Sequence, residues 1–159
     1  ILQYIFMSDF DFNLKTILHN YCLEITQEKM NRIDTLLKSN KKALDTATKS
    51  SAGDKHETAR AMIHLDQENN SMQMLEAQKT FRILSQITIE KHSSIKMGSL
   101  VKTDKALFYI SVGLGKQKIN DTEFFAVSPI SPLAQKLMGL TENAIVNFNG
   151  LIYTILRIV

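Results

Sequence analysis

Two acidic side chains at one turn of the sequence have the type and spacing to take part in metal chemistry. Asp54 and Glu57 are three residues apart at the start of a predicted helix, so their carboxylates can lie near each other. Mg²⁺ prefers six oxygen ligands and commonly takes one or two carboxylates, with phosphates and water completing its shell. Two carboxylates are too few for a tight site, but they could complete a site that another protein supplies for phosphoryl chemistry. The spacing therefore permits a donated half-site for magnesium.

The same two residues also fit a purely structural role. Asp54 as the N-cap of a helix, with Glu57 three residues later, makes a capping box, and both charges favour a helix N-terminus. His56, between the acids, could serve as a ligand or proton donor, or could be a turn histidine without a role. Taken alone, these residues favour the capping interpretation.

The turn lies between two long stretches with helical periodicity. The first 97 residues contain one glycine, Gly53, and no proline. Apolar residues recur at steps of three and four over residues 12–48 and again over residues 58–89. The first stripe comprises Leu14, Ile17, Leu18, Tyr21, Ile25, Met30, Ile33, Leu36, Leu37, Leu44 and Ala47, and the second comprises Met62, Leu65, Met72, Leu75, Phe81, Leu84 and Ile87. A helix with one apolar stripe is not stable alone, so the two arms are predicted to pair as a long antiparallel coiled-coil hairpin.

The second half has the pattern of a small sheet domain. Runs rich in β-branched and aromatic residues predict strands at 107–110, 124–127, 144–148 and 151–156. Asn149-Gly150 predicts a type I′ hairpin turn between the last two strands. A short helix is predicted from Ser131 as N-cap, with Pro132 at its first position and Gly139 at its end. The predicted class is α+β, with an antiparallel sheet and one short helix after the hairpin.

Charge and composition restrict the function without defining it. The net charge of +3 permits contact with nucleic acid but does not imply it. The lone cysteine, Cys22, lies in an apolar helical pattern and is predicted to be a buried side chain in a reducing compartment. No run approaches the ~18 apolar residues of a membrane-spanning helix. We therefore expect a cytoplasmic protein without a membrane partner.

Two segments resemble the Gre family of bacterial transcript cleavage factors, GreA and GreB. The tip sequence Gly53-Asp54-Lys55-His56-Glu57 is similar to the family's Gly-Asp-x-x-Glu element. The segment 131–139, Ser-Pro-Leu-Ala-Gln-Lys-Leu-Met-Gly, resembles the family's Ser-Pro-Ile-Ala-x-x-Leu-x-Gly signature. The chain differs from the common family pattern in having Lys55-His56 between the acids, Thr58 after them and Thr-Glu-Asn-Ala at 141–144.

The resemblance implies a domain organisation and a function. It implies an extension over residues 1–11, a coiled-coil hairpin over 12–90 with its tip at 50–57, and an FKBP-like domain over 91–159. Gre factors bind RNA polymerase through the C-terminal domain, insert the hairpin into the secondary channel and stimulate Mg-dependent cleavage of backtracked transcripts. Asp54 and Glu57 would be the catalytic acids, holding an Mg²⁺ jointly with the polymerase. The signature residues for polymerase binding would be Ser131, Pro132, Leu133, Ala134, Leu137 and Gly139.

By this resemblance the chain is an accessory factor and not itself an enzyme. Its expected partners are RNA polymerase and the 3′ end of the nascent RNA, with the DNA of the elongation complex as a further candidate, and we expect a monomer. Basic residues near the tip either form a solvated face or steer the hairpin toward the negatively charged transcript. They are Lys41, Lys42, Lys49, Lys55 and Arg60.

Two alternatives are consistent with the sequence. The chain could be a non-catalytic binder of the secondary channel that inhibits or modulates the polymerase, with the acids serving only as caps. A free-standing prolyl isomerase is the other alternative, since FKBP-like folds host that activity, although a fold is poor evidence for a function.

Overall fold

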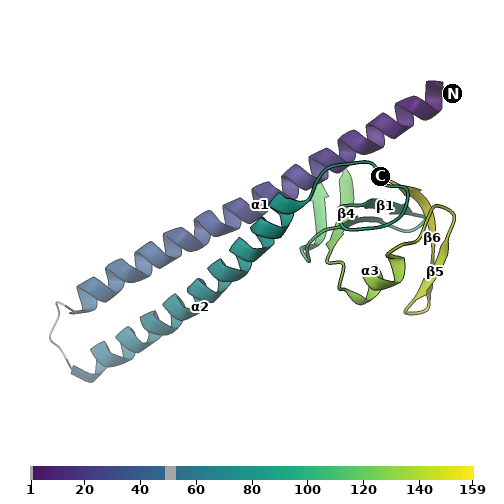
Figure 1. Ribbon diagram of the computed structural model, residues 1–159. Helices are drawn as coiled ribbons and strands as arrows, with labels where there is room; N and C mark the ends of the chain where they lie inside the picture. The colour runs from purple at the N-terminus through teal and green to yellow at the C-terminus, as the bar shows by residue number, and fades with distance from the viewer. Residues whose placement is uncertain (1, 49–52) are drawn as a thin grey trace. The chain divides into compact units, whose positions relative to one another are not determined.

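The computed structural model describes the backbone of residues 2–48 and 53–159, and the side chains in these ranges except those of residues 2–10, 48 and 54. Two long helices are followed by a sheet and one short helix, so the predicted α+β class is confirmed (Figure 1). In chain order the described elements are α1 (Leu2–Thr48), α2 (Gly53–Gln86), β1 (Leu100–Thr103), β2 (Leu107–Ile110), β3 (Gly115–Ile119), β4 (Thr122–Val127), α3 (Pro132–Leu137), β5 (Ile145–Phe148) and β6 (Leu151–Ile158).

The chain divides into two compact units. The sheet unit comprises residues 1–23 and 83–159, and the helical unit comprises residues 24–82. The sheet unit thus includes the first part of α1 and the last residues of α2, whose side chains belong to the same core as the strands.

Helix α1 starts earlier than the sequence pattern predicts, and helix α2 starts close to the predicted position, Asp54. Helix α1 contains neither glycine nor proline and begins at Leu2, so residues of the predicted extension are helical. Helix α2 begins at Gly53, about five residues before the predicted start of its apolar stripe. The backbone φ of Gly53 is 60°, a value that glycine adopts at little steric cost. The predicted tip at residues 50–57 falls in part on residues 50–52, which lie outside the described residues.

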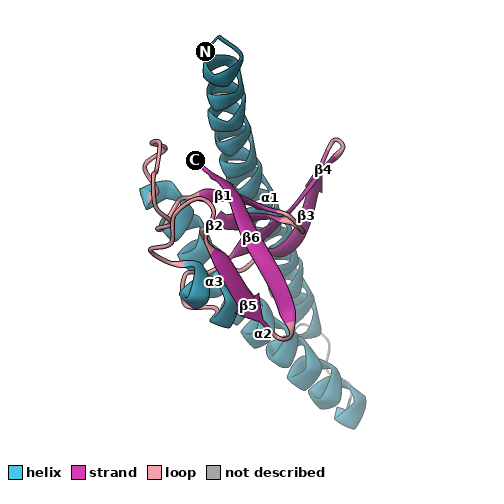
Figure 2. Ribbon diagram, turned by 90° about the vertical axis from the view of Figure 1, so that its right-hand side faces the viewer, coloured by secondary structure: helices cyan, strands magenta, loops and turns pink. Residues whose placement is uncertain are grey.

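The six strands form one sheet in the order β3-β4-β2-β1-β6-β5 (Figure 2). All four predicted strands are present, and the β5–β6 turn has the predicted positive φ values, 51° at Asn149 and 79° at Gly150. Strands β1 and β3 were not predicted. Strand β3, Gly115-Lys116-Gln117-Lys118-Ile119, lies at an edge of the sheet, where polar residues are common and the apolar alternation is weak.

The prediction of a wholly antiparallel sheet was wrong for one pair of strands. Strand β4 runs parallel to β2, with Tyr109 opposite Ala126, and antiparallel to β3. Residues 111–114 cross the end of β4, since Ser111 and Leu114 donate backbone hydrogen bonds to Val127 and Ala126. Strand β4 then returns between β3 and β2, and this placement makes its pairing with β2 parallel.

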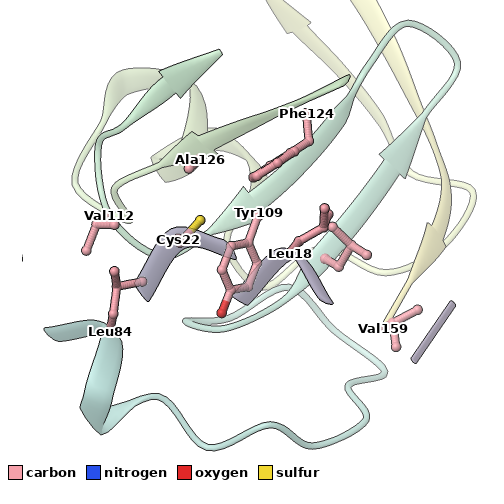
Figure 3. Close-up of a cluster of buried hydrophobic side chains, with 9 residues drawn as sticks. Leu18, Cys22, Leu84, Tyr109, Val112, Phe124, Ala126 and Val159 are labelled. Carbon is pink, nitrogen blue, oxygen red and sulfur yellow. The ribbon is translucent and has the colours of Figure 1, made fainter. Parts of the chain in front are cut away.

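Alternating side chains of the strands build two separate cores, one on each face of the sheet. On one face Tyr109 and Phe124 pack with Leu18 and Cys22 of α1 and Leu84 of α2 (Figure 3). On the other face Phe108 and Ile110 pack with Ala134 and Leu137 of α3. Because successive residues of a strand point to opposite faces, Phe108, Tyr109 and Ile110 alternate between the two cores.

In the helical unit, the buried side of α1 largely follows the prediction. Its less exposed residues, here called the α1 inner row, recur at alternating steps of four and three: Thr26, Met30, Ile33, Leu37, Asn40, Leu44 and Ala47. All five apolar members of this row belong to the predicted first stripe. Leu36 was predicted to be inside as well, but it is 50% exposed.

The prediction for the buried side of α2 was wrong for four of its seven residues and correct for Phe81, Leu84 and Ile87. Its less exposed residues within the helical unit, here called the α2 inner row, are Ile63, Gln67, Asn70, Met74, Ala77 and Phe81. The predicted residues Met62, Leu65, Met72 and Leu75 are instead 57–65% exposed. The helix turns polar residues such as Gln67 and Asn70 inward because they share the spacing of Ala77 and Phe81, and the sequence pattern alone gave more weight to the larger apolar residues.

Candidate functional site

The first two turns of α2 carry the predicted acidic pair. Asp54 follows Gly53 directly in the helix, and Glu57 lies three residues further on with an exposed side chain. A spacing of three residues puts two positions on neighbouring parts of one helix face. The side chain of Asp54 lies outside the described residues, so the pairing of the two carboxylates rests on the backbone positions.

Asp54 lies at the boundary of α2. The φ of Gly53 is 60°, which is not a helical value, so the capping and the metal-binding interpretations of Asp54 both stay predictions. Asp54 and Glu57 are both close to the helix N-terminus, where the helix dipole favours negative charge.

The basic candidates lie on both helices of the helical unit. Lys41 and Lys42 are exposed on α1, Lys55 and Arg60 are exposed on α2, and Lys49 lies outside the described residues. The Cα atoms of Thr48 and Gly53 are joined by five virtual bonds, so they lie at most about 19 Å apart. The C-terminal end of α1 and the acid-bearing end of α2 therefore lie near each other.

The exposed side chains around the acids carry positive charge, and some of them line a shallow hollow. Lys55, Thr58, Ala59 and Met62 line this hollow on one side of α2. His56 is half-buried in the first turn. Lys55 and Arg60 are thus placed to meet an anionic ligand that approaches Glu57 along the helix.

The described part of the chain holds no cluster of three or more histidine, cysteine, aspartate or glutamate side chains placed to bind a metal ion. Carboxylate oxygens are suitable ligands for Mg²⁺, and a pair of them fits a shared site in which other groups complete the octahedron.

None of the described helices carries an apolar stretch that would cross a membrane.

The predicted signature for polymerase binding forms α3 and its two ends, in the sheet unit. The Ser131 hydroxyl accepts a hydrogen bond from the backbone N–H of Ala134 at 3.3 Å, and Pro132 occupies the first helical turn. Ala134 and Leu137 are completely buried in the second core. These two residues therefore stabilise the domain and offer no surface to a partner, whereas Pro132 and the neighbouring Ile130 are exposed.

A buried polar cluster in the sheet unit was missed by the sequence analysis. Lys15 of α1 is completely buried, and its ammonium group donates hydrogen bonds to the backbone carbonyls of Glu90 (2.6 Å) and Val159 (2.9 Å). Burial lowers the pKa of Lys15 from 10.5 to about 8, against the opposing attraction of the Glu90 carboxylate. A lysine between apolar residues of a helix gives no sequence signal for this role.

Two histidines belong to the same part of the sheet unit. His92 Nδ1 lies 2.7 Å from Ser99 Oγ, and its Nε2 lies 3.4 Å from Glu90 Oε1. Ser99 Oγ accepts the backbone N–H of Lys96, so it can donate to Nδ1 of a neutral His92 that carries its proton on Nε2. Burial lowers the pKa of His92, and Lys15 and Lys96 add to this effect while Glu90 opposes it.

The second histidine, His19, has its Nδ1 2.6 Å from the hydroxyl of Tyr109, and burial likewise lowers the pKa of His19. Cys22, next to these groups in the first core, is completely buried, as predicted, and burial raises the pKa of its thiol to about 12. The buried polar cluster that contains Lys15, His92 and His19 is suited to holding α1 against the segment before β1. It is not suited to reaction with a ligand from solvent.

A cavity in the sheet unit bears on the isomerase alternative. It is lined by Asp11, Leu14, Leu100, Lys102, Thr103, Asp104, Lys105, Ala106, Leu107, Arg157 and Val159. The guanidinium of Arg157 pairs with the carboxylate of Asp11, and the Lys105 ammonium lies 3.0 Å from Asp104. The lining contains no aromatic ring, and paired charges form a large part of it, whereas pockets for apolar ligands are mostly hydrophobic and aromatic. This cavity does not favour a peptide isomerase.

Comparisons with protein-family models, with curated proteins and with solved structures find no match for this chain.

Proposed function

We propose that this protein is a Gre-type transcription elongation factor that acts in the cytoplasm. Its helical unit would form a coiled-coil hairpin that enters the secondary channel of RNA polymerase, and its sheet unit would be an FKBP-like domain that binds the polymerase. Asp54 and Glu57 would supply oxygen ligands to an Mg²⁺ ion held jointly with the polymerase, which cleaves the backtracked transcript.

One observation carries this proposal: the acidic pair lies in the first two turns of α2, at the end of a helical unit, with the Glu57 carboxylate exposed. An acid in that place can reach a metal ion held by another protein.

The chemistry of the donor set explains why a partner would be necessary. A metal-activated water requires an ion with most of its shell filled by fixed ligands, and two carboxylates leave about four of six positions to other groups. The isolated chain is therefore expected to cleave no RNA. The exposed Lys55 and Arg60 would attract the transcript to the acids.

The test is transcript cleavage by bacterial RNA polymerase stalled in a backtracked complex. Asp54→Ala and Glu57→Ala should each reduce the stimulated rate by at least about tenfold, since each removes a metal ligand. Raising the Mg²⁺ concentration should partly restore the rate of Glu57→Asp. Glu76→Ala is the matched control, because Glu76 is an exposed acid on the same helix away from the tip.

Three outcomes are informative. Equal cleavage by wild type and both tip variants would remove the assigned roles of the acids. Binding to the polymerase without cleavage by any form would favour the inhibitory channel binder instead. Absence of binding, measured with labelled core polymerase, would contradict both versions.

A further inference from the structure

The outer face of α2 carries an apolar row that the helical unit leaves exposed. This outer stripe consists of Met62, Leu65, Met72 and Leu75, which are 64%, 57%, 62% and 65% exposed. None of the four belongs to the α2 inner row. Leu65 and Met72 each lie midway between two members of that row, two residues from either one. Isolated surface apolar residues need no explanation, but four large ones along one helix face mark an interaction surface.

The spacing of the outer stripe is symmetric. Its steps are three, seven and three residues, so the stripe reads the same in both directions about the midpoint between Glu68 and Asn69. Two copies of α2 packed antiparallel about that midpoint would place Leu65 opposite Met72 in both directions, with Met62 and Leu75 level with each other at the two edges of the contact. A two-fold interface has this self-complementary form, in which residue i contacts j and j contacts i.

We propose that the outer stripe is the interface of a two-fold homodimer in which α2 packs antiparallel against α2 of a second copy. A different protein as partner would give no reason for the symmetric spacing. The sequence predicted these four residues inside the hairpin, where the structure does not bury them.

The same antiparallel register also brings charged residues of the two copies close together. Glu68 lies next to the two-fold axis, so the two Glu68 carboxylates approach each other and weaken the dimer. Lys79 of one copy lies level with Thr58 of the other and within reach of its Glu57, which is exposed. The dimer would thus cover the acid that the proposed function needs free, and dimerisation would compete with entry into the polymerase channel.

The contact is short. From residue 62 to residue 75 it spans about 20 Å of helix at 1.5 Å per residue. Such an interface is smaller than the ~1,600 Å² of stable complexes, so the dimer should form in the micromolar range of concentration.

The first experiment is sedimentation velocity of the full chain from about 1 to about 500 µM, a range that brackets micromolar dissociation constants. The mass should rise from that of one 18.0 kDa chain toward twice that value. Met72→Glu should weaken dimerisation by at least about tenfold, and Glu68→Gln should strengthen it by several-fold. Leu36→Glu is the matched control, because Leu36 is a 50% exposed leucine of α1 outside the stripe. Circular dichroism checks that each variant keeps its helices.

The second experiment tests the register. The two copies of residue 69 would be offset by only about 1.5 Å along the helix, whereas the two copies of residue 79 would be about 30 Å apart. Mild oxidation should therefore link Asn69→Cys chains as disulfide dimers, with molecular oxygen or oxidised glutathione as oxidant, and should leave Lys79→Cys chains unlinked. Cys22 is completely buried and should not react.

A single mass at all concentrations would overturn the proposal. Dimerisation weakened equally by Leu36→Glu would also overturn it, since another surface would then be used. Linking of both cysteine variants would show a parallel or irregular contact and contradict the two-fold register.

Discussion

The two units of the chain bury their apolar side chains to very different extents. In the sheet unit, Tyr109, Phe124 and Leu137 are completely buried, whereas in the helical unit Met62 and Leu75 are 64% and 65% exposed. A sheet covered on both faces buries both sides of its strands, but a helix beside one other helix buries only one of its faces. The sheet unit is therefore expected to hold most of the stability, and the helical unit keeps surface for contacts with other molecules.

The largest expected effect is the removal of a core side chain from the sheet unit. Leu137→Ala should lower the free energy of unfolding by about 3 kcal/mol, because it leaves a cavity in the core that α3 covers. Leu65→Ala, at a leucine that is 57% exposed in the helical unit, should cost less than about 0.5 kcal/mol in the monomer. Urea unfolding followed by circular dichroism at low protein concentration measures both values. Similar losses of unfolding free energy in the two variants would contradict the difference in burial between the two units.

The next effect concerns the buried lysine. Lys15→Met keeps the length of the side chain but removes the donor to the Glu90 and Val159 carbonyls. The Glu90 carbonyl would lose this donor, whereas the Val159 carbonyl would keep the Leu100 N–H, so the change should cost about 1 kcal/mol. Lys29→Met is the control, since Lys29 is exposed on the same helix but in the helical unit. Hydrogen exchange should show faster opening of residues 87–103 in the Lys15 variant alone. An unchanged exchange pattern would show that the cluster does not fasten these segments.

A smaller effect, of opposite sign, is expected in the helical unit. Asn40 belongs to the α1 inner row, and its buried Nδ2 has no hydrogen-bond partner among the described residues. Asn40→Leu should raise the free energy of unfolding by about 1 kcal/mol, because it removes an unpaired polar group and adds apolar contact. Asn31→Leu, on the exposed side of α1, should give no gain. If Asn40→Leu destabilises the protein, Asn40 has a partner that stabilises it.

The smallest effect is a dependence of the sheet unit's stability on pH. In the folded state the pKa values of His19 and His92 lie below the usual value of 6.5. The unfolded chain therefore binds more protons in this range, and stability is lost as the pH falls from about 7 toward 5. The groups around His92 are Glu90, Lys96, Lys15 and Ser99, and the Glu90 carboxylate titrates below this window.

The measurement is urea unfolding at a series of pH values. His92→Asn should flatten the slope between pH 7 and 5, and His64→Asn, at an exposed histidine of the helical unit, should leave it unchanged. Equal slopes in wild type and His92→Asn would show that His92 makes no contribution.

The local signals of the sequence predicted much of the sheet unit. Four strands, the Asn149-Gly150 turn and the cap of α3 by Ser131 were all predicted, because each depends on residues within a few positions of one another. The placement of Asp54 and Glu57 near the start of α2 was predicted for the same reason. Their role in metal binding stays a prediction.

In the helical unit, periodicity showed that both arms are helical but chose the wrong residues in the first part of α2. Two rows with similar spacing compete there, one through Met62 and Met72 and the other through Ile63 and Met74. The first row has more large apolar residues, whereas the second includes Gln67 and Asn70, so apolar size alone favoured the row that the structure leaves exposed.

What the sequence determined by itself was therefore the order and kind of the three helices and of four of the six strands, since turns, caps and helical periods are set by neighbouring residues. Only the tertiary structure decided the parallel pairing of β2 with β4, the burial of Lys15 and the exposure of the outer stripe. Each depends on groups distant in sequence: Lys15 meets Val159 across 144 positions, and β4 reaches β2 only because residues 111–114 cross over its end. Contacts of that kind follow from how whole elements pack, and no local pattern encodes them.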